Sequence, residues 1–180
     1  MLDLRVYRGR VSFLPVDDMK DYKPKDSNIQ LIRNKNDKED ESDSEFKYLS
    51  PINKPVPNDW ITFEENFILF LIVNLPLIAP DFLAAPDSKS NDEQMHMIFI
   101  KEGITKAQLL QVLASTENGE YLNSPFVEWV KIKAFRLEPV SDHDSAQKEG
   151  IIMVDGELVP YGPIQGEILP ACANILANYS

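Results

Sequence analysis

Residues 151–159 read IIMVDGELV, and this stretch carries the strongest hairpin signal of the 180-residue chain. Two apolar runs, 151–154 and 157–159, flank the dipeptide Asp155-Gly156. A two-residue type I′ turn needs a positive φ at both central residues, and Asp-Gly favours that conformation. The stretch therefore predicts a tight β-hairpin of two antiparallel strands.

Short apolar runs of the same kind recur along the rest of the chain. They are rich in Ile, Val, Phe, Leu and Tyr, and clusters of Pro, Gly, Asp, Asn or Ser separate them. Such spacing is typical of an antiparallel sandwich or barrel. We predict a mainly β fold with one or two helices, whose further strands cover residues 7–14, 67–75, 94–101, 130–137 and 164–169.

One segment has helical periodicity instead. Thr105 and Gln108 have the spacing of a capping box, and Gly119 is suited to end a helix. We expect a helix between residues 105 and 119. Its apolar face forms part of a core by default, and it carries Leu109, Val112, Leu113 and Thr116.

A long polar stretch, residues 17–58, interrupts the strand pattern. Within it, residues 37–45 (DKEDESDSE) hold six acids and one Lys. Such a composition cannot bury enough apolar surface to offset its ordering entropy, so we predict a flexible acidic insertion between two paired strands. A solvated tether is the simpler interpretation of this insertion. The alternative is regulation by phosphorylation, for which Ser42, Ser44 and Ser50 are the candidates.

Composition excludes several classes of function. The chain has 18 Lys and Arg against 29 Asp and Glu, a formal net charge of −11, which argues against nucleic acid as a partner. Its seven glycines are scattered and form no phosphate-binding loop. With Cys172 as the single cysteine, no internal disulfide can form, and we expect a reducing compartment. The first residues do not resemble a secretory signal, and the run 67–79 is too short to span a membrane.

Few polar residues suggest chemistry by themselves. Asp155 and Glu157 at the hairpin tip could hold Mg²⁺ or position a nucleotide, although spacing alone favours a role in the turn. His96 lies between two methionines, and we interpret it as a core or edge group whose hydrogen bonds are satisfied. His143 lies among acids, and we interpret it as part of a solvated loop.

Several stretches of this sequence resemble the C-terminal half of the sphingosine kinases, members of the diacylglycerol-kinase-like lipid kinase superfamily. The order and spacing of these stretches fit that family over residues 1–16 and 55–176, and the acidic insertion lies where the family varies in length. The matching stretches are LRVYRGRVSFLP (4–15), FLAAP (82–86), GITKAQLL (103–110), AFRLEP (134–139) and VDGEL (154–158).

The resemblance implies that residues 1–180 form a single C-terminal domain, an antiparallel β-sandwich that houses a lipid tunnel. The intact enzyme would phosphorylate sphingosine to sphingosine 1-phosphate with ATP and Mg²⁺. The glycine-rich nucleotide loops and the general base belong to an upstream catalytic domain that is absent from these residues. We therefore expect no catalytic residue in this chain and no activity from it alone. Two alternatives stay open: a non-catalytic module that binds sphingoid bases, or a related kinase acting on ceramide or diacylglycerol.

The resemblance also assigns roles to particular residues. Glu157 matches the nucleotide-side carboxylate that supports Mg²⁺-ATP, and Asp155 is a weaker candidate for the same role. The partners implied are a sphingoid base, ATP bound through the missing domain and, peripherally, a membrane, so the protein would be cytoplasmic with reversible membrane association. The implied wall of the lipid tunnel consists of Leu69, Leu71, Ile78, Phe82, Ala84, Ile98, Leu109, Val112, Leu113, Thr116 and Tyr121.

Overall fold

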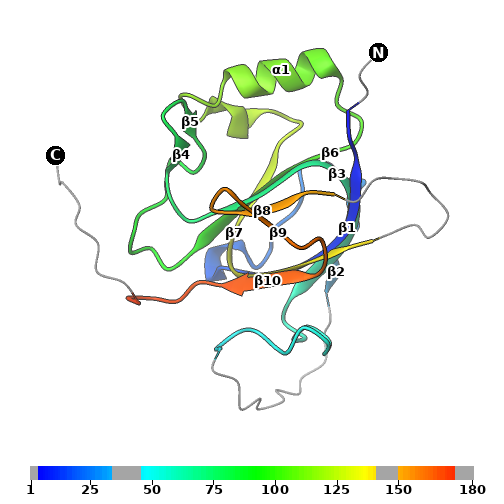
Figure 1. Cartoon of the computed structure of the whole chain (residues 1–180), viewed down its shortest axis with the longest axis vertical. Coiled ribbons are helices and arrows are strands. Elements are labelled where there is room, and N and C mark those ends of the chain that lie inside the picture. The colour runs from blue at the N-terminus through cyan, green and yellow to red at the C-terminus, as the bar shows by residue number, and fades with distance from the viewer. Residues whose placement is uncertain (1–3, 34–45, 141–149, 173–180) are drawn as a thin grey trace.

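The computed structural model describes residues 4–33, 46–140 and 150–172 (Figure 1). Its main sheet is antiparallel and consists of six strands: β1 (Tyr7–Pro15), β2 (Ile32–Arg33), β3 (Ile61–Val73), β6 (Met95–Lys101), β7 (Glu128–Pro139) and β10 (Ile164–Glu167). Two small hairpins pair β4 (Leu77–Ala79) with β5 (Phe82–Leu83), and β8 (Ile152–Val154) with β9 (Glu157–Val159). The remaining elements are the helix α1 (Lys106–Ala114) and the 3-10 turns η1 (Asp17–Met19) and η2 (Glu120–Asn123).

The main sheet closes on itself. Strand β1 pairs with both β3 and β7, and β6 pairs with the same two strands, so the circuit of pairings is complete. The long strands β3 and β7 make this possible because each is long enough to pair with both β1 and β6. Residues 61–67 of β3 pair with β1, and residues 67–73 pair with β6. The mainly β, antiparallel, sandwich-like fold predicted from the sequence is confirmed.

An aromatic core fills the interior of the closed sheet. Alternate residues of a strand point to the same side, so Met95, Met97 and Phe99 of β6 all face inward. The ring of Phe67 packs edge-on against that of Phe99, with centroids 5.7 Å apart. The other buried members of this core are Val11, Phe13, Ile29, Ile61, Phe63, Val130 and Ile132.

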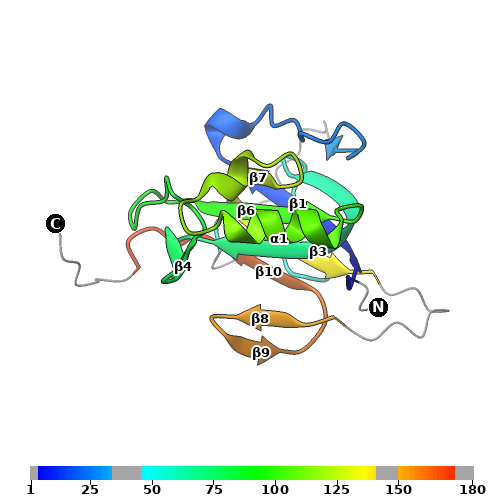
Figure 2. The ribbon, with the colours of Figure 1, turned by 90° about the horizontal axis from the view of Figure 1, so that it is seen from above.

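A second core lies on the outer side of β6. Ile98 and Ile100 alternate with the inward-facing residues of the strand and are fully buried. Helix α1 lies over this side of the sheet, with the β4–β5 hairpin beside the end of the helix (Figures 1 and 2). We call this core the outer cluster. Its buried members are Val73, Ala84, Ala85, Ile98, Ile100, Ile104, Val112, Tyr121 and Val127.

Residues 17–33, the first flank of the polar stretch, pack against the sheet, contrary to our prediction of a flexible insertion. The reason is Glu128, a buried carboxylate on β7. Its oxygens accept hydrogen bonds from the backbone N–H groups of Lys25 and Asp26, at 3.0 and 2.7 Å, and from the Tyr22 hydroxyl. Glu128 thereby fixes this flank and is itself satisfied.

Residues 46–58, the second flank, are held in a similar way. The carboxylate of Glu167 accepts hydrogen bonds from three successive backbone N–H groups, those of Lys47, Tyr48 and Leu49. Residues 34–45, which contain Ser42, Ser44 and the whole acidic run 37–45, lie outside the described residues. The prediction that the polar stretch connects two paired strands is confirmed, because β1 and β3 are neighbours.

The predicted start of helix α1 is confirmed, and its end differs from the prediction. The capping box of α1 forms, with the Thr105 hydroxyl accepting from the Gln108 N–H and the Gln108 side chain accepting from the Thr105 N–H. The helix ends at Ala114, earlier than expected. The hydroxyls of Ser115 and Thr116 donate to carbonyls of the last turn, and such bonds compete with the helical pattern. None of the helices in the described ranges is long and apolar enough to cross a bilayer.

Candidate functional site

Most of the predicted lipid-tunnel wall comes together in the outer cluster. Ala84, Ile98, Val112 and Tyr121 are buried members of it. Four further wall residues, all half-buried, pack against them: Leu69, Leu71, Phe82 and Leu109. Segments far apart in the sequence therefore build one continuous apolar surface between β3, β6, α1 and the β4–β5 hairpin.

Three predicted wall residues are placed differently. Ile78 is 46% exposed and Leu113 is 43% exposed, so both lie at the rim of the outer cluster. Leu113 follows Val112 on the helix and is rotated by about 100° from the buried face. Thr116 is buried, and its hydroxyl lies 2.9 Å from the Leu113 carbonyl and 3.3 Å from that of Asp81. It contributes a methyl group and no free polar atom to the site.

The outer cluster also contains residues that the sequence analysis did not place in the wall. Ile100 shares the outward face of β6 with Ile98, and Val127 begins the segment that leads into β7. The alternation along β6 could have identified Ile100. Val127 gave no such signal, because its position depends on the turn η2 that precedes it.

His96 is the least satisfied group near the outer cluster. It lies on the same face of β6 as Ile98, and its ring stacks on Trp129 with centroids 6.2 Å apart and planes 13° from parallel. The side chain is buried, and neither ring nitrogen has a hydrogen-bond partner among the described residues. Burial, with a smaller contribution from Lys131, lowers the pKa of His96. The expectation of a buried histidine was correct, but the expectation of satisfied hydrogen bonds was wrong.

Neither of two cavities in the described part of the chain lies within the outer cluster, whose central side chains are buried. A cavity of about 450 Å³ lies between α1 and η2, but polar side chains such as Gln108, Gln111 and Ser115 make up much of its lining. A larger cavity, of about 860 Å³, lies elsewhere on the sheet. Val112 is the one predicted wall residue that borders either of these two. A lipid tail could therefore enter the outer cluster only if its side chains separate.

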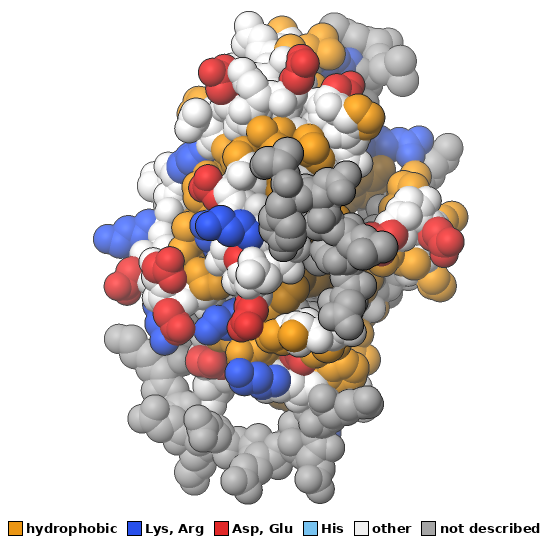
Figure 3. All heavy atoms as spheres, turned by 90° about the vertical axis from the view of Figure 1, so that its left-hand side faces the viewer, with side chains coloured by type: hydrophobic (Ala, Val, Ile, Leu, Met, Phe, Trp, Pro, Cys, Tyr) orange, Lys and Arg blue, Asp and Glu red, His pale blue; other side chains and the backbone are white. Residues whose placement is uncertain are grey.

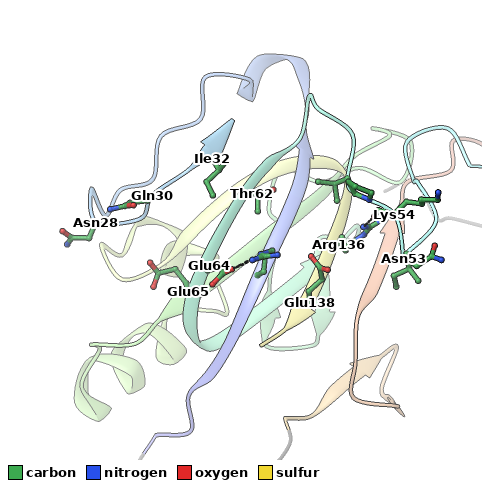
Figure 4. Close-up of a pocket in the computed structure, with 14 residues that line it drawn as sticks. Asn28, Gln30, Ile32, Asn53, Lys54, Thr62, Glu64, Glu65, Arg136 and Glu138 are labelled. Carbon is green, nitrogen blue, oxygen red and sulfur yellow. Dashed lines mark hydrogen bonds and ion pairs between the residues drawn. The ribbon is translucent and has the colours of Figure 1, made fainter. Parts of the chain in front are cut away.

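The larger cavity is a polar cleft on the outside of β1, β3 and β7, with walls from the two flanks of the insertion (Figure 4). On its floor, Nε and Nη2 of Arg10 both donate to one oxygen of Glu64, at 2.9 and 2.6 Å. Glu65 and Glu138 also line it. No pattern in the sequence predicted this cleft. With two arginines, a lysine and three glutamates in its lining, it does not suit an acyl chain.

One wall of the cleft depends on the buried Arg136. Its guanidinium donates to the backbone oxygens of Ser50, Pro51 and Lys54 at 2.6–3.2 Å, and its Nε donates to the side chain of Gln165. The Ser50 hydroxyl is 2.8 Å from the Pro55 oxygen and 3.1 Å from Arg136. Arg136 is thus a structural anchor, and Ser50, a candidate for phosphorylation, lies within its network.

The hairpin with Asp155 and Glu157 forms as predicted and stands apart from the main sheet (Figure 2). Asp155 has φ 50° and Gly156 has φ 85°, as a type I′ turn requires. Both carboxylates are exposed. Across the described ranges, no group of three His, Cys, Asp or Glu is arranged to hold a metal ion. Glu157 fits Mg²⁺ only as one of few protein ligands, with phosphate and water oxygens supplying the others.

Comparison with known proteins identifies a family and several similar proteins. Residues 45–177 match the family described as "YegS C-terminal NAD kinase beta sandwich-like domain". The chain is 34% identical to human sphingosine kinase 2 over 132 residues, which are 72% of this chain and 19% of that protein. It is 28% identical to mouse sphingosine kinase 1 over 173 residues, 94% of this chain and 41% of that protein. A crystal structure of a putative diacylglycerol kinase from Bacillus anthracis str. Sterne aligns at 12% identity with a TM-score of 0.45, covering 93% of this chain and 40% of that one. The family match and the two sphingosine kinases confirm the resemblance stated from the sequence.

Proposed function

Because this chain belongs to the family of YegS C-terminal NAD kinase beta sandwich-like domains, and its relatives are sphingosine kinases, we propose that it is the lipid-binding part of a sphingosine kinase. The chain spans only 19% to 41% of the length of the two relatives compared above. The intact protein would transfer the γ-phosphoryl group of ATP to the primary hydroxyl of sphingosine. This chain alone would bind the lipid and be inactive.

The observation that carries the proposal is the outer cluster. Wall residues from the β3–β5 region, β6, α1 and η2 converge on one apolar surface that has few polar groups. Burying about fifteen methylenes of a sphingoid tail would stabilise the complex by roughly 12 kcal/mol before ordering costs. That gain can offset the separation of several half-buried side chains, such as Leu109 and Phe82. Affinity would come from the tail, and the head group would face the upstream domain.

The second contribution of this chain would be the carboxylate of Glu157. Phosphoryl transfer depends on positioning and on neutralising the charge of the phosphates, and Mg²⁺ supplies much of that neutralisation. Glu157 is exposed at the tip of a hairpin that projects from the sheet, so it can reach a nucleotide held by another domain. Asp155 lies two residues away and is the weaker candidate, because it also has to form the turn.

Two alternative functions differ from this one, the first in the upstream kinase domain and the second in the lipid substrate. A non-catalytic module would bind the same lipid without an upstream kinase domain. A related kinase would accept ceramide or diacylglycerol, which carry two chains. We expect the intact protein to work in the cytoplasm and to associate reversibly with membranes.

The proposal can be tested with monomeric sphingosine and the 180-residue chain. Tryptophan at position 109 would fill the outer cluster, whereas tryptophan at the neighbouring position 110, on the exposed side of α1, would not. We expect Leu109→Trp to weaken sphingosine binding by at least about tenfold and Leu110→Trp to leave it unchanged. Circular dichroism and the urea midpoint would establish that both variants fold. Equal affinity of the two variants, or no binding by the unmodified chain, would overturn the proposal.

A further inference from the structure

His96 brings two polar atoms into the apolar outer cluster. The residue is 2% exposed, and its alternation with Ile98 and Ile100 along β6 places it on the outward face of that strand. Val73, a buried member of the outer cluster, pairs with His96 between β3 and β6, and Trp129, which packs against the cluster, stacks on its ring. None of the side chains coloured on the face drawn in Figure 3 is a histidine. The imidazole therefore lies inside the site that the proposed function assigns to a lipid tail.

Neither ring nitrogen of His96 has a hydrogen-bond partner in the part of the chain that the structure describes. Buried polar groups without a partner are rare in proteins, because such groups have lost their hydrogen bonds to water without replacement. The charges of Asp87, Asp92 and Lys131 act on the ring, but none of these side chains bonds to it. The two nitrogens are therefore available to a ligand that enters the outer cluster.

The protonation state of the ring decides which ligand group suits it. Burial lowers the pKa of His96, so the imidazole is neutral at physiological pH. A neutral imidazole has one N–H donor and one nitrogen acceptor, and a hydroxyl group can use either, because it both donates and accepts. An ionised carboxylate or ammonium group would lose its hydration in the apolar site, and a neutral ring compensates that cost poorly. The chemistry of the ring thus favours a hydroxyl.

The position of His96 on β6 indicates which part of a lipid tail it would meet. Strand β6 ends at Lys101, which pairs with Phe67, and Phe67 pairs with Tyr7 at the start of β1. The upstream domain of the proposed kinase precedes β1, so it would lie nearer to the Lys101 end of β6. His96 lies near the opposite end of the strand, roughly 17 Å away at about 3.3 Å per residue. It would therefore face the end of the tail that is remote from the head group.

We propose that His96 forms a hydrogen bond with a hydroxyl group near the end of the lipid tail, so that the outer cluster selects sphingoid bases with a hydroxylated tail. The inference rests on the proposed function, because it concerns the tail of the same ligand. Two other polar side chains of the predicted wall, Thr116 and Tyr121, already donate their hydroxyl hydrogens to backbone oxygens. A site that offers a hydrogen bond to one hydroxyl at one place discriminates strongly for it.

Binding of three monomeric ligands to the 180-residue chain tests this inference. The ligands are sphingosine, sphingosine with an added hydroxyl on the last tail carbon, and sphingosine with an added hydroxyl in the middle of the tail. A hydroxyl that is buried without a partner weakens binding. We therefore expect the terminal-hydroxyl ligand to bind at least about tenfold more tightly than the mid-tail ligand.

Variants of His96 assign that preference to the ring. His96→Leu removes both ring nitrogens and should abolish the difference between the two hydroxylated ligands while sphingosine still binds. His96→Gln keeps a donor and an acceptor and should retain part of the difference. The matched control is Met97→Leu, because Met97 is the next residue of β6 and faces the aromatic core inside the closed sheet, so the preference should not change. Circular dichroism and the urea midpoint would establish that all three variants fold.

Three results would overturn the inference alone, each obtained while sphingosine binds. They are equal binding of the two hydroxylated ligands to the unmodified chain, a preference for the mid-tail ligand, and a terminal-hydroxyl preference that persists in His96→Leu. If none of the three ligands bound, sphingosine included, the proposed function would be contradicted, and this inference with it.

Discussion

The hydroxyl of Tyr121 lies 2.6 Å from the backbone oxygen of Ala84, and both residues are buried. This hydrogen bond connects the turn after α1 with the segment after β5, across the outer cluster. Burial raises the pKa of Tyr121 to about 12, so the hydroxyl stays protonated and donates throughout the physiological range. Together with the Thr116 hydroxyl, it is one of the polar groups that are hydrogen-bonded within this mainly apolar site.

Replacing Tyr121 by Phe should destabilise the protein by about 1–3 kcal/mol, because the buried Ala84 carbonyl would lose its partner. Urea unfolding followed by circular dichroism measures this change. Tyr7→Phe is the matched control, because no hydrogen bond of the Tyr7 hydroxyl is found among the described residues, and its unfolding free energy should change by less than about 0.5 kcal/mol. If the two variants were equally stable, the Tyr121 contact would have no structural role.

Arg136→Met should lower the free energy of unfolding by about 2–4 kcal/mol. It should also loosen residues 46–58, because the half-buried carbonyls that accept from Arg136 would lose their donor. Urea unfolding gives the free energy, and limited proteolysis reports on the flank. Arg10→Met is the control, because the Arg10–Glu64 pair is exposed and should contribute at most about 1 kcal/mol. Unchanged proteolysis of the Arg136 variant would show that the flank is held by other contacts.

The free energy of unfolding should fall as the pH drops below about 6.5, which is the ordinary pKa of histidine. Burial lowers the pKa of His96 in the folded protein. Below pH 6.5 the unfolded chain therefore binds a proton at His96 that the folded chain does not bind. Above it, both states are neutral and the effect disappears. The variant His96→Phe should lose this component of the pH dependence, measured from urea midpoints between pH 5 and pH 8, a range set by the titration of histidine. An identical pH profile for the variant would mean that His96 titrates alike in both states.

Glu157→Gln in the intact kinase should raise the KM for ATP more than the KM for sphingosine, because the carboxylate is assigned to the nucleotide side. Steady-state kinetics with each substrate varied in turn measures both constants. Glu138→Gln, a change of the same kind in the polar cleft, should alter neither constant. A larger effect of Glu157→Gln on the lipid constant than on the ATP constant would remove its proposed role.

The parts of the fold that were predictable from the sequence are those defined locally. The type I′ turn at Asp155-Gly156 and the capping box of Thr105 and Gln108 depend on residues within four positions of one another. The apolar run at residues 94–101 likewise predicted β6, because its composition favours a strand. These features need no knowledge of the rest of the chain.

The parts that could not be predicted depend on long-range contacts. Residues 17–33 have the composition of a flexible segment, yet Glu128, about a hundred positions away, supplies the acceptors that order them. Leu113 fits the apolar face of α1 by periodicity, but the sheet below the helix covers Val112 and leaves Leu113 exposed. The polar cleft also escaped prediction, because it exists only where the two ordered flanks meet the outer face of the sheet.

Photocrosslinking shows directly whether a sphingoid tail occupies the outer cluster. A sphingosine that carries a photoreactive group at the end of its tail would be irradiated with the 180-residue chain, and the adducts mapped by mass spectrometry. We expect adducts on residues of the outer cluster such as Ile98, Val112 and Tyr121, and we expect unlabelled sphingosine to suppress them. Adducts confined to the polar cleft around Arg10 and Lys54, or labelling that unlabelled sphingosine does not suppress, would contradict this placement of the tail.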